Sequence, residues 1–175
     1  MIISLTGFMG CGKSSVGRRL SQLLCCRFMD LDQVIEDKAG RSIPEIFASE
    51  GEAAFRAMEK ETLAEILDSD SCESTLVLAL GGGAIMQAEC EKMITERTRC
   101  FYLKASVDTL MSHLANEATG RPLLAGNKDL YALRDRICEL MELRAATYER
   151  CASTVIMTDD KTIGAISQEI IDTIK

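Results

Sequence analysis

The sequence contains no tryptophan, two prolines and a single histidine, His113. Basic residues are also scarce: 20 lysines and arginines stand against 27 aspartates and glutamates, which leaves a net charge of −7. This balance argues against binding to nucleic acid or to an anionic membrane, since both select clustered positive charge. Any anion that the protein binds must therefore be held by a few local cations.

Metal-binding and export signals are missing as well. The eight cysteines show no C-x-x-C spacing, and one histidine offers little to a zinc site. Several cysteines lie in apolar stretches, where a free thiol behaves as a small hydrophobic group, so we expect reduced thiols in a reducing compartment. No apolar run approaches a membrane span, and no signal peptide fits before the first apolar strand. These features predict a soluble, cytoplasmic protein.

The pattern of apolar residues predicts an α/β fold. The 175 residues, 47% hydrophobic and 27% charged, suit one globular domain and exclude disorder. Apolar spacing predicts strands at 2–6, 28–31, 75–80, 100–103 and 154–157, and helices near 13–25, 52–68, 87–97, 107–117, 128–150 and 161–174. Ser42 and Glu45 have capping-box spacing before a short apolar turn. Strands that alternate with helices favour a parallel sheet covered on both faces, and residues 116–129 favour a loop within the domain.

A phosphate-binding loop follows the first strand. Residues 7–14, GFMGCGKS, fit G-x-x-x-x-G-K-[ST] and precede a helical pattern, as that motif requires. Glycines let backbone N–H groups surround phosphate oxygens, Lys13 reaches the terminal phosphates, and the Ser14 hydroxyl can bind Mg²⁺. The motif predicts binding of ATP or GTP. A switch GTPase is disfavoured, because the N-K-x-D guanine motif is absent: Leu130 follows Asn127-Lys128-Asp129.

A small-molecule kinase also needs a carboxylate near the attacking hydroxyl group. Asp30 and Asp32 close the second predicted strand, where residues i and i+2 point the same way. We therefore expect both carboxylates to face a crevice at the carboxyl ends of the strands. The structural alternative is a solvated turn in which Asp32 caps a helix.

Arginines and glycines supply candidates for the rest of such a site. Arg56 lies at the edge of an apolar helical stripe that contains Glu59, so it forms either a structural ion pair or an anion site oriented by Glu59. Gly81-Gly82-Gly83 follows a strand and either admits a ligand close to the backbone or forms a tight turn. Arg144 lies on an apolar stripe and either holds an internal anion or forms a buried salt bridge.

Arg121 lies in the predicted loop, where it either closes over the phosphates or remains an exposed loop residue. Taken together, the motifs resemble the shikimate kinase family over nearly the whole chain. The matching stretches are GFMGCGKSSVGRRL, FMDLDQVIE, GRSIPEIFASEGEAAFRAMEKE, LALGGGAI, RPLL and LRAATYER, in the order and spacing of that family.

The resemblance implies a P-loop, three-layer α/β/α fold like that of nucleoside monophosphate kinases, with a five-stranded parallel sheet and a mobile lid. It implies one domain spanning 1–175, a substrate-binding region at about 31–61 and a lid at about 115–127. The implied reaction transfers the γ-phosphoryl group of MgATP to the 3-hydroxyl of shikimate. We expect no nucleic-acid or membrane partner, and the resemblance implies a monomeric protein.

The resemblance also implies a role for each matching residue. Asp32 holds the attacking hydroxyl and acts as its base, and Asp30 lies near Mg²⁺ through water, beside Ser14. The implied shikimate contacts are Asp32, Arg56, Gly81, Gly82, Gly83 and Arg144. The implied contacts to the ATP phosphates are Gly10, Cys11, Gly12, Lys13, Ser14, Ser15 and Arg121, of which Lys13 and Arg121 act with Asp32 in catalysis.

The sequence departs from the family pattern at one position. Many members carry another arginine about seven residues before the lid arginine, where it packs against adenine, and here that residue is Leu114. Adenine packing therefore needs another residue, which leaves strict preference for ATP open. Two alternatives to shikimate kinase also stay open: a kinase for a related small acid such as gluconate, and a non-catalytic nucleotide-binding regulator.

Overall fold

A parallel five-stranded sheet forms the centre of the protein. The computed structural model describes residues 1–69, 74–114 and 129–175. The strands are β1 (Ile2–Thr6), β2 (Arg27–Asp30), β3 (Leu76–Ala79), β4 (Arg99–Lys104) and β5 (Thr154–Met157), in the spatial order β2-β3-β1-β4-β5. All neighbouring strands pair in parallel, which confirms the predicted sheet. Every residue of β3 is buried, as expected for a sheet covered on both faces.

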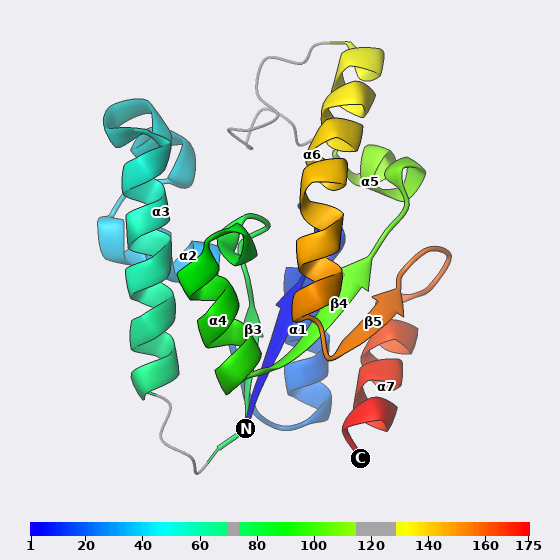
Figure 1. The fold of residues 1–175 in the computed structure, drawn as a ribbon. Coiled ribbons are helices and arrows are strands. Elements are labelled where there is room, and N and C mark those ends of the chain that lie inside the picture. Colours follow the sequence, from blue (N-terminus) through cyan, green and yellow to red (C-terminus); the bar gives the residue numbers. More distant parts are fainter. Residues whose placement is uncertain (70–73, 115–128) are drawn as a thin grey trace.

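Helices cover the sheet and extend above it (Figure 1). They are α1 (Lys13–Leu23), α2 (Leu31–Ala39), α3 (Ile43–Ser69), α4 (Ala88–Arg97), α5 (Val107–Leu114), α6 (Leu130–Cys151) and α7 (Ile163–Ile174), with a short 3₁₀ helix at Ala84–Met86. Helices α1 and α7 pack together, α4 and α6 both contact β4, and α2 packs on α3. Helix α7 forms where the apolar spacing predicted one, with Ile166 and Ile170 buried and Ile163 exposed.

The region after β2 differs from the sequence-based prediction. The strand was expected to continue to Leu31, but it ends at Asp30 and helix α2 begins at once. A helix here was considered only in the alternative in which Asp32 is its cap. The Asp30 side chain accepts a hydrogen bond from the Asp32 backbone N–H at 3.2 Å. An aspartate in this position satisfies one of the free N–H groups of a first helical turn and therefore starts the helix. Asp30, rather than Asp32, is the helix cap.

The following helix also begins earlier than predicted. It starts at Ile43 and is interrupted at Gly51, where φ is 85° and ψ is 174°. The predicted pairing of Ser42 with Glu45 is present, because the Glu45 carboxylate accepts hydrogen bonds from the Ser42 N–H and hydroxyl at 2.7 Å each. Only glycine adopts such a backbone conformation without strain, so Gly51 lets one segment turn between two helical stretches.

The predicted lid, including Arg121, lies outside the described residues, as does the end of the helix expected at 107–117. Among the described residues, no helix combines the length and apolar character needed to cross a membrane. The seven cysteines within the described ranges are free thiols. The parallel strands bring the segments that follow β1, β2 and β3 to one edge of the sheet, and this edge carries the candidate site.

Candidate active site

One cleft at the carboxyl ends of the strands collects the residues singled out from the sequence. Its volume is about 700 Å³. All the predicted site residues that the structure describes line it: Gly10, Cys11, Gly12, Lys13, Ser14, Ser15, Asp30, Asp32, Arg56, Gly81, Gly82, Gly83 and Arg144. These residues come from five separate segments of the chain, so the fold brings together what the sequence keeps far apart.

The loop between β1 and α1 is built to receive an anion. Gly12 precedes α1 with φ of 95°, a left-handed conformation that favours glycine, and no side chain caps the helix. The first N–H groups of a helix lack intrahelical partners and carry positive potential. The Lys13 ammonium donates to the carbonyl oxygens of Gly7 at 2.9 Å and Phe8 at 3.1 Å, which holds its charge over the loop. Together these groups are suited to bind a phosphate.

Ser14 and Asp30 place two oxygen groups side by side at the start of α1. The Ser14 hydroxyl donates to Asp30 Oδ2 at 2.5 Å. A hydroxyl and a carboxylate are ligand types that Mg²⁺ accepts, directly or through its waters. Their position next to the phosphate site therefore fits a magnesium ion that accompanies a nucleotide.

Asp32 reaches the cleft by a different route from the one predicted. The prediction that Asp30 and Asp32 are alternate residues of one strand is wrong, because Asp32 lies in the first turn of α2. Both side chains nevertheless line the cleft. A Cβ atom placed on Gly81 would lie 2.7 Å from Asp32 Oδ1 and 2.6 Å from Glu59 Oε1. Gly81 thus lies against two carboxylates, and any side chain there would fill the space between them.

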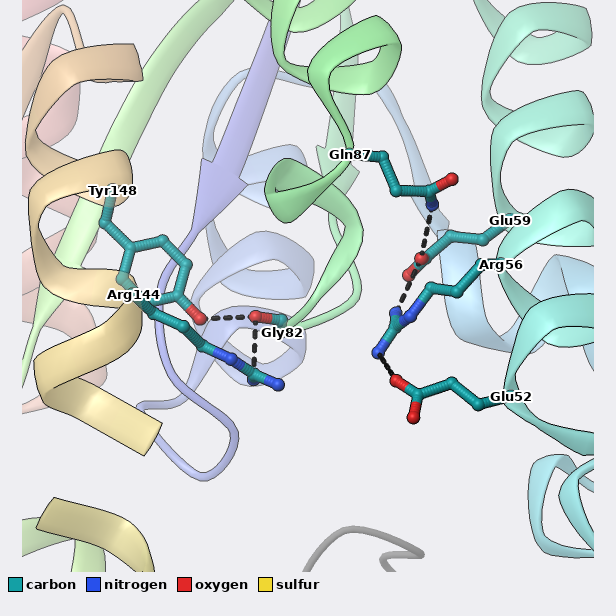
Figure 2. A network of polar contacts seen from close by, with 7 residues as sticks. All are labelled: Glu52, Arg56, Glu59, Gly82, Gln87, Arg144 and Tyr148. Atoms are coloured by element: carbon teal, nitrogen blue, oxygen red, sulfur yellow. Dashed lines mark hydrogen bonds and ion pairs between the residues drawn. The ribbon is translucent and has the colours of Figure 1, made fainter. Parts of the chain in front are cut away.

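Arg56 is held by acidic residues of its own helix (Figure 2). Its guanidinium donates to Glu59 at 2.7 Å and to Glu52 at 3.2 Å, and Gln87 donates to the same Glu59 oxygen at 3.1 Å. Burial lowers the pKa of Arg56, but the neighbouring carboxylates more than offset this and raise it overall. The guanidinium therefore stays charged and its direction is set by Glu59.

Glu59 is fully buried, and burial raises the pKa of its carboxyl group although Arg56 and Gln87 oppose that shift. Its Oε1 atom has no hydrogen-bond partner among the described residues. The expected ion pair of Arg56 and Glu59 thus exists, and it also lines the cleft. The structural ion pair is therefore confirmed, and the use of Arg56 as an anion site stays a prediction.

Arg144 enters the cleft from the opposite side, on α6 (Figure 2). Its side chain is buried, with a residue exposure of 7%, and it donates to the Gly82 carbonyl at 3.3 Å. The Tyr148 hydroxyl donates to the same oxygen, and burial raises the pKa of Tyr148. No carboxylate of the described residues forms an ion pair with Arg144, so the buried salt bridge considered from the sequence is absent from that part of the chain.

Sequence reasoning missed a second wall of the cleft, which lies beyond the phosphate loop. It consists of Thr109, His113, Thr158, Lys161, Ile163 and Ile166. Thr109 and His113 are four residues apart on α5, and the other four follow strand β5 or begin α7. Their position after the carboxyl ends of β4 and β5 was a usable signal. Leu114 is fully buried and therefore does not form part of this wall, whereas His113 does.

Comparisons with known proteins identify the family of this chain. The shikimate kinase family model matches residues 9–175. A shikimate kinase of Dictyoglomus turgidum is 38% identical, over 99% of this chain and 96% of its own length. A shikimate kinase of Thermus thermophilus is 40% identical, over 97% of this chain and 88% of its own length.

Solved structures give the same result. The shikimate kinase of Acinetobacter baumannii in complex with shikimate superposes with a TM-score of 0.90 at 35% identity, covering 99% of this chain and 92% of that one. The shikimate kinase of Aquifex aeolicus superposes with a TM-score of 0.79 at 29% identity, covering 99% of this chain and 96% of that one. Since the family model and full-length relatives span nearly the whole sequence, the chain belongs to the shikimate kinase family.

Proposed function

We propose that this chain transfers the γ-phosphoryl group of MgATP to the 3-hydroxyl group of shikimate, giving shikimate 3-phosphate and ADP. Membership of the shikimate kinase family supports the activity and its place in the route to chorismate and the aromatic amino acids. The observation that carries the assignment of residues is the single cleft in which a phosphate loop, an aspartate and two arginines meet. The free thiols suit a reducing compartment, and we place the enzyme in the cytoplasm.

The phosphate loop would bind the nucleotide. The N–H groups at the start of α1 and the Lys13 ammonium face the position for the β- and γ-phosphates, and the nearby loop residues Gly10, Cys11, Gly12 and Ser15 line it. Ser14 would bind Mg²⁺ through its hydroxyl and Asp30 through water. The ion, when bound, would neutralise phosphate charge. The base would lie along the wall formed by His113 and the start of α7.

The other end of the cleft would bind shikimate. Arg56 and Arg144 approach from α3 and α6 and are suited to grip its carboxylate, since guanidinium groups bind carboxylates with paired hydrogen bonds (Figure 2). The backbone of Gly81, Gly82 and Gly83 would line the pocket at close range. Asp32 would accept a hydrogen bond from the 3-hydroxyl and orient it towards the γ-phosphate. We assign residues 31–61 to this substrate-binding region.

The transfer step needs positioning and charge neutralisation rather than a covalent intermediate. As the 3-hydroxyl oxygen bonds to the γ-phosphorus, its proton passes to Asp32. The bond from that phosphorus to the bridging oxygen breaks, and its electron pair remains on the β-phosphate of ADP. Lys13 would offset the charge on the phosphates. We keep Arg121, in the lid proposed at about 115–127, as the second cation on the transferred group; this assignment rests on the RPLL match alone.

The function is tested by measuring ADP release from MgATP in parallel wells that contain shikimate, gluconate, a nucleoside monophosphate or no acceptor. We expect release with shikimate and little release without an acceptor, because a closed site excludes water. If ADP is released with gluconate and not with shikimate, the protein is a kinase whose acceptor is gluconate instead of shikimate. If no acceptor causes ADP release although the protein binds nucleotide, the result favours a non-catalytic regulator.

Substitution of Gly83 tests the arginine pocket without removing an arginine. A Cβ atom at this position would lie 2.6 Å from Nη2 and 2.7 Å from Nη1 of Arg56, so Gly83→Ala must displace the guanidinium. Since a hydrogen bond to a charged group contributes about 1.5–3 kcal/mol, we expect the KM for shikimate to rise about 10- to 100-fold. The KM for ATP should stay close to that of the wild type.

The matched control is Gly164→Ala, in the first turn of α7, where a new methyl group meets its nearest neighbour at 3.9 Å. In steady-state kinetics this variant should keep the wild-type KM for shikimate. If Gly83→Ala also keeps the wild-type KM for shikimate, Arg56 does not bind the acceptor in the orientation that the structure gives it.

A further inference from the structure

The peptide group between Gly10 and Cys11, in the phosphate loop, is held at both of its polar atoms. The Gly10 carbonyl oxygen lies 2.7 Å from Nδ1 of His113, at the end of α5. The Cys11 N–H of the same peptide donates to the Phe8 carbonyl at 3.2 Å. A carbonyl oxygen only accepts hydrogen bonds, so Nδ1 of His113 carries the proton. His113 is therefore the residue outside the loop that fixes this peptide.

Gly10 needs such a restraint because its backbone is permissive. Its φ is +82°, in a region that glycine enters freely, and a glycine peptide can rotate at little steric cost. Leu114, next to His113, packs directly on Gly10: a Cβ atom placed there would lie 2.8 Å from the Leu114 side chain. The last two residues of α5 thus hold Gly10 in two ways, Leu114 by packing and His113 by a hydrogen bond.

The direction of the Gly10 carbonyl affects anion binding. In the structure the Gly10 carbonyl oxygen points towards α5 and is hydrogen-bonded to His113. If the peptide rotated, its partial negative charge would be free to face the phosphates that the N–H groups of Gly12, Lys13 and Ser14 are placed to bind. His113 also lines the cleft itself, on the wall beyond the phosphate loop.

We propose that His113 is a positioning residue for nucleotide binding, which acts by donating its Nδ1 hydrogen bond to the Gly10 carbonyl and so keeping the phosphate loop ready for the nucleotide. This inference rests on the proposed use of the loop for ATP, and it gives a role to the single histidine of the chain. It does not depend on which acceptor the enzyme phosphorylates.

The test compares two substitutions at His113. Asparagine keeps an N–H donor at the same number of bonds from the backbone as Nδ1, whereas leucine has similar bulk and no donor. Titration calorimetry with ADP and with ATP, in the absence of any acceptor, measures nucleotide binding directly. We expect His113→Leu to raise both dissociation constants about three- to tenfold, as for the loss of one neutral hydrogen bond. The dissociation constants of His113→Asn for ADP and ATP should stay within about twofold of those of the wild type.

Kinetics and stability separate this role from simple packing. His113→Leu should raise the KM for ATP and leave the KM for shikimate unchanged. Ser112→Ala is the control, since among the described residues the Ser112 hydroxyl bonds only within α5, to the Thr109 carbonyl. All titrations are run well below each variant's melting temperature. Wild-type affinity in His113→Leu would overturn the proposal, and so would equal losses in the leucine and asparagine variants.

The two proposals fail in different ways. If the wild-type protein binds ATP but phosphorylates no acceptor, the proposed function fails while the His113 comparison still gives a result. If shikimate is phosphorylated and both variants bind nucleotide as the wild type does, only the role of His113 is wrong.

Discussion

Asp32→Asn should lower turnover about 100- to 10,000-fold while nucleotide affinity stays nearly unchanged, the range typical for loss of a general base. The substitution keeps the size of the side chain and its place in the first turn of α2. It removes the negative charge that would take the proton of the shikimate 3-hydroxyl. Since we propose that Asp32, which lies beside Gly81, contacts the acceptor, the phosphate loop should be unaffected.

The measurement combines kcat from ADP release with the dissociation constant of ATP from calorimetry. The matched control is Asp37→Asn, on the same helix, where the carboxylate is exposed and accepts a hydrogen bond from Gln33 at 2.9 Å. This control should keep full turnover. Unchanged turnover in Asp32→Asn would remove Asp32 from the mechanism and leave positioning and charge as the source of catalysis.

Arg144→Ala should raise the KM for shikimate about 30-fold or more. Loss of one partner from a buried, hydrogen-bonded charge pair costs about 2–5 kcal/mol, and the buried guanidinium of Arg144 lies in a cleft where it forms no ion pair with a described carboxylate. Arg144→Lys should recover only part of the loss, because an ammonium group cannot form the paired hydrogen bonds of a guanidinium.

Initial rates over a shikimate series, with melting temperatures for each variant, check this result. Arg150→Ala is the control on the same helix, where the arginine is exposed and pairs with Glu91 at 2.7 Å. It should change neither KM. A variant of Arg144 that melts earlier but keeps the wild-type KM would show that the arginine serves only to hold the Gly82 carbonyl beside Tyr148.

Local sequence patterns were sufficient for the sheet and for the phosphate loop. The strands are short apolar runs bounded by polar residues, and the loop motif consists of neighbours in the chain, so each signal lies within one segment. The same local patterns failed after Asp30. Whether Leu31 continues the strand or begins a helix depends on the Asp30 side chain accepting the Asp32 N–H, which apolar periodicity does not contain.

The assembled cleft was decided by tertiary structure. Sequence alone determined that the chain carries a phosphate loop, a parallel sheet and arginines on apolar helical stripes. Only packing determined that Gln87 donates to Glu59 beside Arg56, that Arg144 meets Gly82 rather than a carboxylate, and that His113 reaches Gly10 across 103 positions of the chain. The reason is physical: a helix or strand forms from interactions between near neighbours, whereas these contacts exist only after α3, α5 and α6 have packed around the sheet.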